Sequence, residues 1–311
     1  EITTRLVGSE MCIRDRVKEE QLACLSLQAA QTTVTFNKKT GWVDYLDING
    51  APAFKKGYSL VPDFWRAPTD NDYGVDLQKK FAAWKDPKMD LKKFECKEFG
   101  DAKQVVAEYD MPTVSAKLLM TYTLRPDGQL VVNEKLTTDP NAKEKPMMFR
   151  FGMQLVMPQE FSKLQYYGRG PGENYIDRHW GDRIGVYNQN VADQYWGYVR
   201  PQESGNHTDI RWWKVLSGAG TGLEFYSNIP MECSSLNYLT SDLDGGPEKM
   251  AHQMHSGDLT PRKFTVVKIQ ERQFGLGGID SWSQWPEPEV QMPYGDREFT
   301  FVINPLANPA K

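Results

Sequence analysis

Apolar and polar residues alternate along much of this chain in short runs, which is the period expected of β-strands. Residues 129–136 are the clearest case. One face of this run carries Leu130, Val132, Glu134 and Leu136, and the other carries Val131, Asn133 and Lys135. The alternation predicts a strand, and residues 125–128 (Arg-Pro-Asp-Gly) place proline and glycine where a tight turn before it needs them.

Other short runs of β-branched, aromatic and aliphatic residues predict further strands. They span residues 32–36, 42–48, 105–109, 116–124, 147–157, 223–226, 263–270 and 299–303. The pair Asn49 and Gly50 follows one of them and is a strong tight-turn signal. We expect one helix, over residues 77–84, with Phe81 and Trp84 on the same side.

Many short strands separated by turn signals, with almost no helix, indicate an all-β sandwich. The chain shows no internal repeat, and no Pro/Ser/Gly-rich break divides it into halves. The number of strands exceeds that of an immunoglobulin-like domain. We therefore expect a single large antiparallel sandwich rather than two small ones.

Composition narrows the class of protein further. The 311 residues are 40% hydrophobic and 25% charged, with a net charge of −4, which is typical of a globular chain. The sequence has neither a long apolar run of the kind that spans a membrane nor the basic patch of a nucleic-acid binder. The 9 tryptophans and 14 tyrosines favour β structure or contact with carbohydrate.

Cysteine and histidine spacing gives no metal or disulfide signature. Cys12, Cys24, Cys96 and Cys233 are widely separated, without a Cys-x-x-Cys pair. His252 and His255 have a spacing that could ligate a metal on a helix, but no third ligand accompanies them. We interpret them as exposed loop histidines and assign no metal site.

The first 16 residues fit nothing that follows. They resemble a translated sequencing adapter, because residues 6–16 match one reading frame of a common tagmentation primer. We exclude residues 1–16 from the fold and expect a domain over residues 17–311. A natural disordered tail is the alternative. If the segment is an adapter, upstream protein is missing, and the compartment, cytoplasmic or periplasmic in a bacterium, cannot be read from this end.

Four polar, glycine- and proline-rich loops carry the candidate chemistry. They span residues 64–74, 166–178, 200–212 and 275–285. In the first loop, Asp70, Asn71 and Asp72 could bind a cation, cap a helix or hydrogen-bond a sugar. We favour capping, because it is the commonest role for such residues before a helix.

The second and third loops contain several carboxylates. Glu173 and Asp177 could be a paired acid/base site. However, Arg169, Arg178 and Arg183 stand close by in the sequence, so a structural network of ion pairs is the favoured interpretation. The third loop repeats this mixture, with Glu203, Asp209 and Arg211 beside glycine.

The fourth loop, GLGGIDSWSQW, combines glycines with Trp282 and Trp285. Glycines allow positive φ and close approach, and an indole offers a flat apolar face to a sugar ring. Taken alone, these residues favour tryptophans that fill the core over tryptophans that contact a ligand. Ser281 lacks the Gly-x-Ser-x-Gly setting of a nucleophile, and the chain has no phosphate loop or dinucleotide fingerprint.

Together, FWRAPTDNDYG, YYGRGPGENYIDR, YVRPQESGNHTDIRW and GLGGIDSWS resemble the C-terminal large β-domain of the β-galactosidases of glycoside hydrolase family 2. The resemblance spans about residues 22–306. It implies a β-supersandwich like that of galactose mutarotase. It also implies that the catalytic carboxylates lie in an upstream (β/α)8 barrel, so this chain holds no catalytic residue.

By the same resemblance, Trp282 reaches toward the barrel and binds substrate by stacking, while Trp285 keeps a structural role. The loop from Gly74 lies near the mouth of the site in relatives, but residues 75–77 depart from their pattern. The family's magnesium and sodium sites belong mainly to the barrel, so we assign no cofactor here.

We therefore expect a fragment of a bacterial β-galactosidase that hydrolyses terminal β-galactosides such as lactose with retention. Its partners would be the substrate, the barrel and further copies in a homo-oligomer, without nucleic acid or membrane. Alone, the chain should show no turnover. The alternatives are a natural small subunit of a two-chain enzyme and a free carbohydrate-binding or mutarotase-like module.

Overall fold

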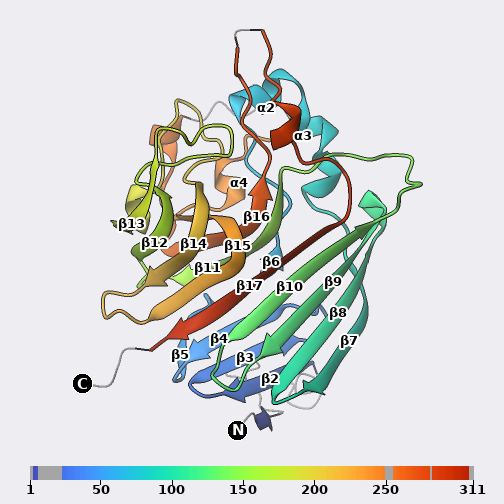
Figure 1. Ribbon diagram of the computed structural model, residues 1–311, viewed down its shortest axis with the longest axis vertical. Helices are drawn as coiled ribbons and strands as arrows, with labels where there is room; N and C mark the ends of the chain where they lie inside the picture. The colour runs from blue at the N-terminus through green and yellow to red at the C-terminus, as the bar shows by residue number, and fades with distance from the viewer. Residues whose placement is uncertain (1–2, 6–22, 249–254, 281, 308–311) are drawn as a thin grey trace.

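The computed structural model describes residues 3–5, 23–248, 255–280 and 282–307. Two antiparallel sheets make up most of this chain, and short helices occupy the loops (Figure 1). The predicted all-β class is confirmed.

The smaller sheet has five strands in the order β1-β2-β3-β4-β5. They are β1 (Thr3–Arg5), β2 (Cys24–Ala29), β3 (Thr32–Asn37), β4 (Val43–Ile48) and β5 (Ala51–Pro52). The strands predicted at residues 32–36 and 42–48 correspond to β3 and β4. Residues 3–5 were expected outside the fold, but as β1 they pair with β2 at the edge of this sheet.

The larger sheet has twelve strands, nine of them in the order β13-β12-β14-β15-β17-β10-β9-β8-β7. β16 pairs with β15 and β11, and β6 pairs with β11. In chain order these strands are β6 (Val61–Pro62), β7 (Asp90–Phe99), β8 (Ala102–Met111), β9 (Ala116–Leu124), β10 (Leu130–Thr138), β11 (Arg150–Pro158), β12 (Lys163–Gly170), β13 (Arg183–Asn190), β14 (His207–Leu216), β15 (Gly222–Leu236), β16 (Phe264–Gln273) and β17 (Arg297–Leu306).

Strands β8, β9 and β10 form a regular meander. Each neighbouring pair keeps an unbroken register over its whole length. The predicted turn before β10 is present, with the Gly128 amide donating to the Arg125 carbonyl at 3.0 Å and with Gly128 at φ +88°. Within β10 the predicted alternation holds, and one face is fully buried. Its members are Leu130, Val132, Glu134 and Leu136.

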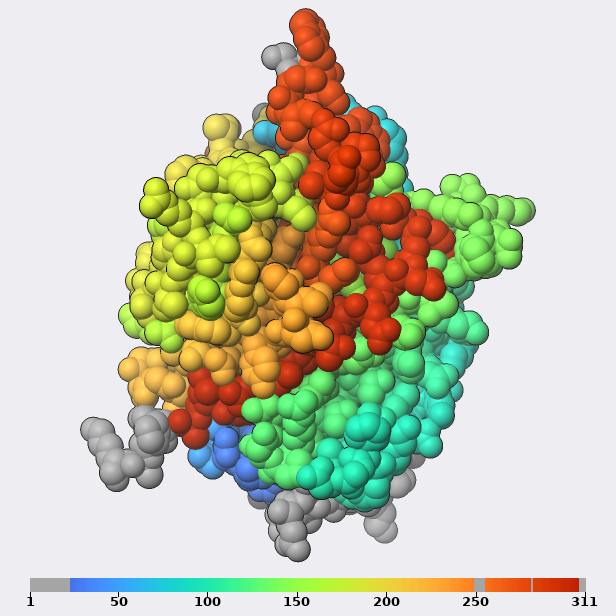
Figure 2. Space-filling view, viewed as in Figure 1, coloured from blue at the N-terminus to red at the C-terminus, as the bar shows by residue number. Residues whose placement is uncertain are grey.

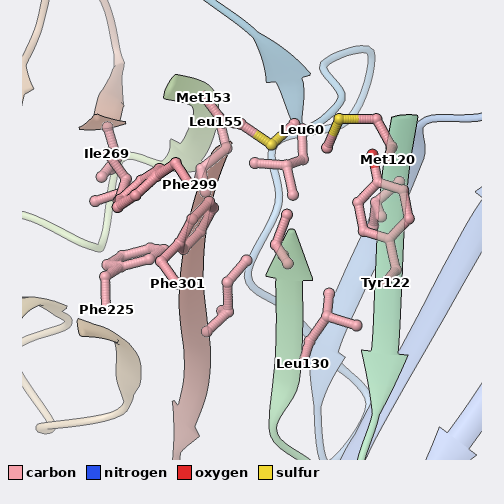
Figure 3. Close-up of a cluster of buried hydrophobic side chains, with 14 of the residues drawn as sticks. Leu60, Met120, Tyr122, Leu130, Met153, Leu155, Phe225, Ile269, Phe299 and Phe301 are labelled. Carbon is pink, nitrogen blue, oxygen red and sulfur yellow. The ribbon is translucent and has the colours of Figure 1, made fainter. Parts of the chain in front are cut away.

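The main core lies between the small sheet and the large one. Phe36 of β3 packs edge-on against Tyr122 of β9, with ring centroids 5.3 Å apart. Leu130, Phe225 and Phe301 bring β10, β15 and β17 into the same cluster (Figure 3). The aromatic-rich composition is therefore used largely inside the sandwich.

The alternation of polar and apolar residues did not reveal β7, β12, β13 or β14. β7 is an edge strand with charged residues on both faces, including Lys92, Lys93 and Glu95, so it has no alternating pattern. β15 continues well past the predicted residues 223–226. The prediction was too short because Asn228 and Pro230, which usually indicate turns, lie inside the strand.

The helices are short and lie in the connections. They are α2 (Asp70–Gly74), α3 (Leu77–Lys80) and α4 (Thr240–Leu243), with 3-10 turns η1 (Ala82–Trp84), η2 (Pro112–Val114), η3 (Val191–Asp193), η4 (Ser256–Asp258) and η5 (Pro288–Val290). The helix predicted at residues 77–84 appears as α3 followed by η1, and Phe81 and Trp84 are both buried. Within the described ranges, no helix has the length and apolarity to cross a membrane.

Candidate functional site

The four motif loops meet at one end of the large sheet. Residues 274–280 and 282–290, orange to red at the top of Figure 1, rise there beside α2 and α3, and Figure 2 shows them projecting from the body of the molecule. A hollow of about 300 Å³, the first hollow, is lined by all four motifs. Its lining includes Asn71, Asp177, Glu203 and Gly277.

The expected capping role is confirmed for Asp72, although the helix that it caps is α2, which was not predicted, rather than the helix expected at residues 77–84. The Thr69 hydroxyl accepts from the Asp72 amide at 3.2 Å, and the Asp72 carboxylate accepts from the Thr69 amide at 2.8 Å. The same carboxylate binds the fully buried Arg66 guanidinium through two hydrogen bonds, at 3.0 and 2.7 Å. Asp72 is therefore a structural residue. Asn71 instead turns toward the fourth motif and donates to the Leu276 carbonyl at 3.0 Å.

Glu173 and Asp177 do not form a free carboxylate pair. Glu173 accepts from Arg178 and from the Tyr198 hydroxyl, and its second oxygen accepts from the Gly205 amide at 2.7 Å. Asp177 accepts from two backbone amides of the fourth motif. An acid/base role needs a carboxyl that reaches substrate. The favoured network interpretation is confirmed for Glu173 and Arg178.

Arg169 does not join that network. Its side chain pairs with Asp209 of the third motif at 2.5 Å, and Arg211 lies 3.6 Å from the same carboxylate. The pair of Arg169 with Asp209 thus joins the second loop to the third. Ion pairs among these residues were expected from the arginines and carboxylates of the loops, but the partners could not be assigned from local spacing.

Below the first hollow lies a buried cluster of four charges. Arg150 Nη2 is 2.7 Å from Glu203 and Lys268 Nζ is 3.1 Å from Asp63, with Arg150 also 3.4 Å from Asp63. All four side chains are almost fully buried. Burial lowers the pKa of Lys268, and the neighbouring Arg150 lowers it further. Two positive and two negative charges balance, which is the condition for burying them at all.

Two other buried polar residues lie beside this cluster. His207 is held between the Gln194 side chain and the Arg169 carbonyl, and burial lowers its pKa to about 4, so the ring is neutral. Burial raises the pKa of Glu232 to about 7, although the Asn206 amide donates to its carboxylate at 2.9 Å. Both are fully enclosed, which gives them structural rather than catalytic roles.

The fourth motif presents its two tryptophans differently. Trp285 is half-buried, packs edge-on against Phe274 and lies under the Lys80 ammonium. Trp282 is 91% exposed. The Asp280 carboxylate accepts from the backbone amides of Trp282 and Ser283, both at 2.7 Å, and so shapes the tip of the loop. The structural role expected of Trp285 is confirmed, while the substrate role of Trp282 stays a prediction.

More large apolar side chains surround this end of the sandwich. A second hollow of about 550 Å³ adjoins the first and shares Asp177, Arg178 and Tyr198 with it. Trp180 and Trp196, both strongly exposed, line it. Exposed aromatic residues in such density indicate a surface that meets another molecule or domain. The sequence analysis missed both, although each lies in or beside a motif loop.

The remaining candidates are histidine, serine and cysteine residues. His255 is exposed, as expected, whereas His252, Ser281 and Cys12 lie outside the described residues. Cys96 and Cys233 are free thiols. Among the residues that the structure describes, no cluster of three or more histidine, cysteine or carboxylate side chains could hold a metal ion.

Comparison with known proteins finds a matching family and longer relatives. A family model described as beta galactosidase small chain matches residues 28–303. A beta-galactosidase from Lactobacillus delbrueckii subsp. bulgaricus is 32% identical over 91% of this chain and 27% of its own length. One from Priestia megaterium is 29% identical over 91% of this chain and 26% of its own length. The chain thus spans about a quarter of these relatives.

Solved structures support the fold. A galactose mutarotase related enzyme from Lactobacillus acidophilus superimposes with a TM-score of 0.52 at 7% identity, covering 91% of this chain and 97% of that one. The predicted likeness to the galactose mutarotase sandwich is therefore confirmed. At so low an identity the likeness extends to the fold and not to the reaction.

Proposed function

The chain belongs to the beta-galactosidase small chain family, and from that premise we propose that it forms one wall of the galactoside site of a β-galactosidase. Trp282 is the residue that we assign to the sugar. The substrates are terminal β-galactosides such as lactose, and the reaction is hydrolysis with retention.

One observation carries this proposal. Trp282 is 91% exposed at the tip of a loop whose stem is fixed by side chains of two other motifs. Leaving an indole in water forgoes about 1.5–3 kcal/mol of burial energy. A loop with a fixed stem that presents such a side chain is therefore better explained by a partner surface, and the C–H face of a pyranose suits an indole.

The chemistry itself is assigned to another part of the enzyme. Retaining hydrolysis needs two carboxyl groups about 5 Å apart that flank the glycosidic bond. Glu173, Asp177 and Glu203 lie near the hollows, but each is held by amides, hydroxyls or buried cations. This supports a catalytic barrel in the remaining length of the enzyme. The exposed Trp180 and Trp196 provide an aromatic surface on which that barrel docks.

The experiment uses the chain alone and in a chimaera. In the chimaera, this chain replaces the matching region of the L. delbrueckii beta-galactosidase, and hydrolysis of o-nitrophenyl β-galactoside is measured. We expect no turnover from the chain alone and turnover from the chimaera. Loss of the stacking surface in Trp282→Ala should lower kcat/KM by about 10- to 100-fold, with Trp282→Phe intermediate.

Two results would contradict the proposal. One is hydrolysis by the isolated chain that is lost on replacement of Glu173 or Glu203. The other is a chimaera, assembled as judged by gel filtration, whose kcat/KM does not respond to Trp282→Ala.

A further inference from the structure

The stem of the loop that bears Trp282 is held by side chains distant in sequence. The stem comprises residues 274–277, directly after β16. Arg66 donates to the carbonyl oxygens of Phe274 and Gly275, the latter at 3.1 Å, and Asn71 donates to that of Leu276 at 3.0 Å. The first motif therefore fixes three consecutive carbonyl groups.

Asp177 of the second motif holds backbone N–H groups of the same stem, where the first motif holds carbonyl groups. Its Oδ1 accepts from the Leu276 amide at 3.0 Å, and its Oδ2 accepts from the Gly277 amide at 2.9 Å. Hydrogen bonds to an ionised acceptor are about twice as strong as neutral ones. Both oxygens of this carboxylate are used on adjacent residues of the stem, so Asp177 is committed to the backbone rather than to a ligand.

The glycines of this motif are explained by the same contacts. A Cβ on Gly275 would lie 2.7 Å from Asp177 Oδ2, and a Cβ on Gly278 would lie 2.6 Å from Asn71 Nδ2. Gly277 and Gly278 also have φ angles of +70° and +71°, which favour glycine. The backbone can thus approach both side chains and then turn toward the tip.

We infer that Asp177 is a positioning residue for Trp282, and that Asn71 holds the same stem by a further hydrogen bond. The two hydrogen bonds between Asp177 and the stem are called the tie. Trp282 lies five positions after Gly277, whose amide is held by Asp177, and the amide of Trp282 is itself held by Asp280. Ordering a backbone residue costs about 1–2 kcal/mol. The tie supplies this order before substrate arrives, so the indole stands in place when the sugar binds. This inference rests on the function proposed above.

The first test uses the chain itself and needs no activity. Hydrogen exchange of the Leu276 and Gly277 amides is measured in Asp177→Ala and in the matched control Asp182→Ala. Asp182 lies in the second hollow and accepts from the Gly172 amide at 3.2 Å, away from the stem. We expect exchange at least about tenfold faster in Asp177→Ala and unchanged in Asp182→Ala.

Asp177→Asn provides a second variant of the same size. Its amide keeps one acceptor oxygen but sets an NH2 group against the second backbone N–H, so one of the two protections should be lost. Amides of β9 and β10 serve as an internal check that the fold is intact. Unchanged exchange at Leu276 and Gly277 in Asp177→Ala would overturn the inference.

The second test asks whether the tie acts through Trp282. In the chimaera, Asp177→Ala should lower kcat/KM by about tenfold, but by less than twofold when Trp282→Ala is already present. Additive losses in this double-mutant cycle would overturn the positioning role, since a general structural defect acts in both backgrounds. An unchanged kcat/KM in Trp282→Ala alone would instead count against the proposed function, while the exchange result would still decide the tie.

Discussion

The meander of β8, β9 and β10 and the end of the sheet that carries the motif loops are held together by different forces. The meander buries apolar side chains at every second position, in a register set by short turns. The loop end buries charges. Arg66 pairs with Asp72 within one loop, and Arg150 pairs with Glu203, which is far from it in sequence. Hydrophobic burial is non-directional and tolerates small changes, whereas a buried ion pair requires both partners.

The meander and the loop end use different interactions because they have different structural roles. A sheet face that only has to exclude water can be built from any well-packed apolar set. A loop that must stand away from the core and still hold one conformation has no core of its own, so polar ties with defined geometry replace it. The ties at Arg66, Asn71 and Asp177 are of this kind.

The largest effect that separates the two regions should come from Arg150→Met compared with Arg125→Met. Arg150→Met leaves Asp63 and Glu203 buried with one cation fewer, which costs about 3–5 kcal/mol of unfolding free energy. Arg125 is exposed in the turn before β10, so the same substitution there should change it by less than about 0.5 kcal/mol. Urea denaturation measures both. Equal costs would show that the buried charges do not distinguish the loop end.

The same contrast explains how far the sequence could predict this molecule. β9 has the bounds expected from its alternation, because each of its side chains faces either the core or solvent. β12 and β14 were missed because they overlap the second and third motif loops, whose glycines and polar residues indicated loops. β14 also buries polar residues. His207 and Thr208 of β14 are examples, both buried.

For the site, the sequence identified the loops but not their connections. The resemblance singled out Trp282, whose indole is exposed and free to contact another molecule or domain. Nothing in the pattern distinguished Asp177, which holds the stem, from Asp182, which does not. Pairing between residues about 100 positions apart depends on the fold, and a local pattern carries no information about it.

Glu134 is the exception within the meander and gives the second prediction. It occupies a fully buried position of β10, and among the described residues neither carboxyl oxygen has a hydrogen-bond partner. Burial raises the pKa of this carboxyl well above its usual range, and the nearby Asp63 and Glu271 raise it further. The group is therefore protonated in the folded protein under conditions in which the unfolded chain has already ionised.

Because of this buried carboxyl, the unfolding free energy falls as the pH rises. Below about pH 4.3, both states are neutral at this position. As the pH rises toward the folded pKa, only the unfolded state gains from ionisation, so the unfolding free energy falls by about 1.4 kcal/mol per pH unit. Glu134→Gln removes this loss.

Urea denaturation should show the unfolding free energy of Glu134→Gln rising relative to that of the original chain between pH 5 and pH 7, by at most about 1.4 kcal/mol per pH unit. Glu108→Gln, at an exposed position of β8, is the control and should show no such growth. A constant difference for Glu134→Gln would mean that the carboxyl ionises inside the sandwich, and the meander would then resemble the loop end in burying charge.

The smallest effects should come from the two tryptophans that share one loop. Trp285→Ala removes a half-buried indole from Phe274 and Lys80 and should cost about 1–2 kcal/mol of unfolding free energy. Trp282→Ala removes a side chain that is 91% exposed, so its cost should stay within about 0.5 kcal/mol. Thermal or urea unfolding of the chain measures both. If Trp282→Ala proves as destabilising as Trp285→Ala, its indole packs against this chain and cannot serve as a free face for a sugar. If it leaves stability unchanged while turnover of the chimaera falls, the indole contributes to binding alone, which is what separates a loop built for a partner from a sheet built for its own core.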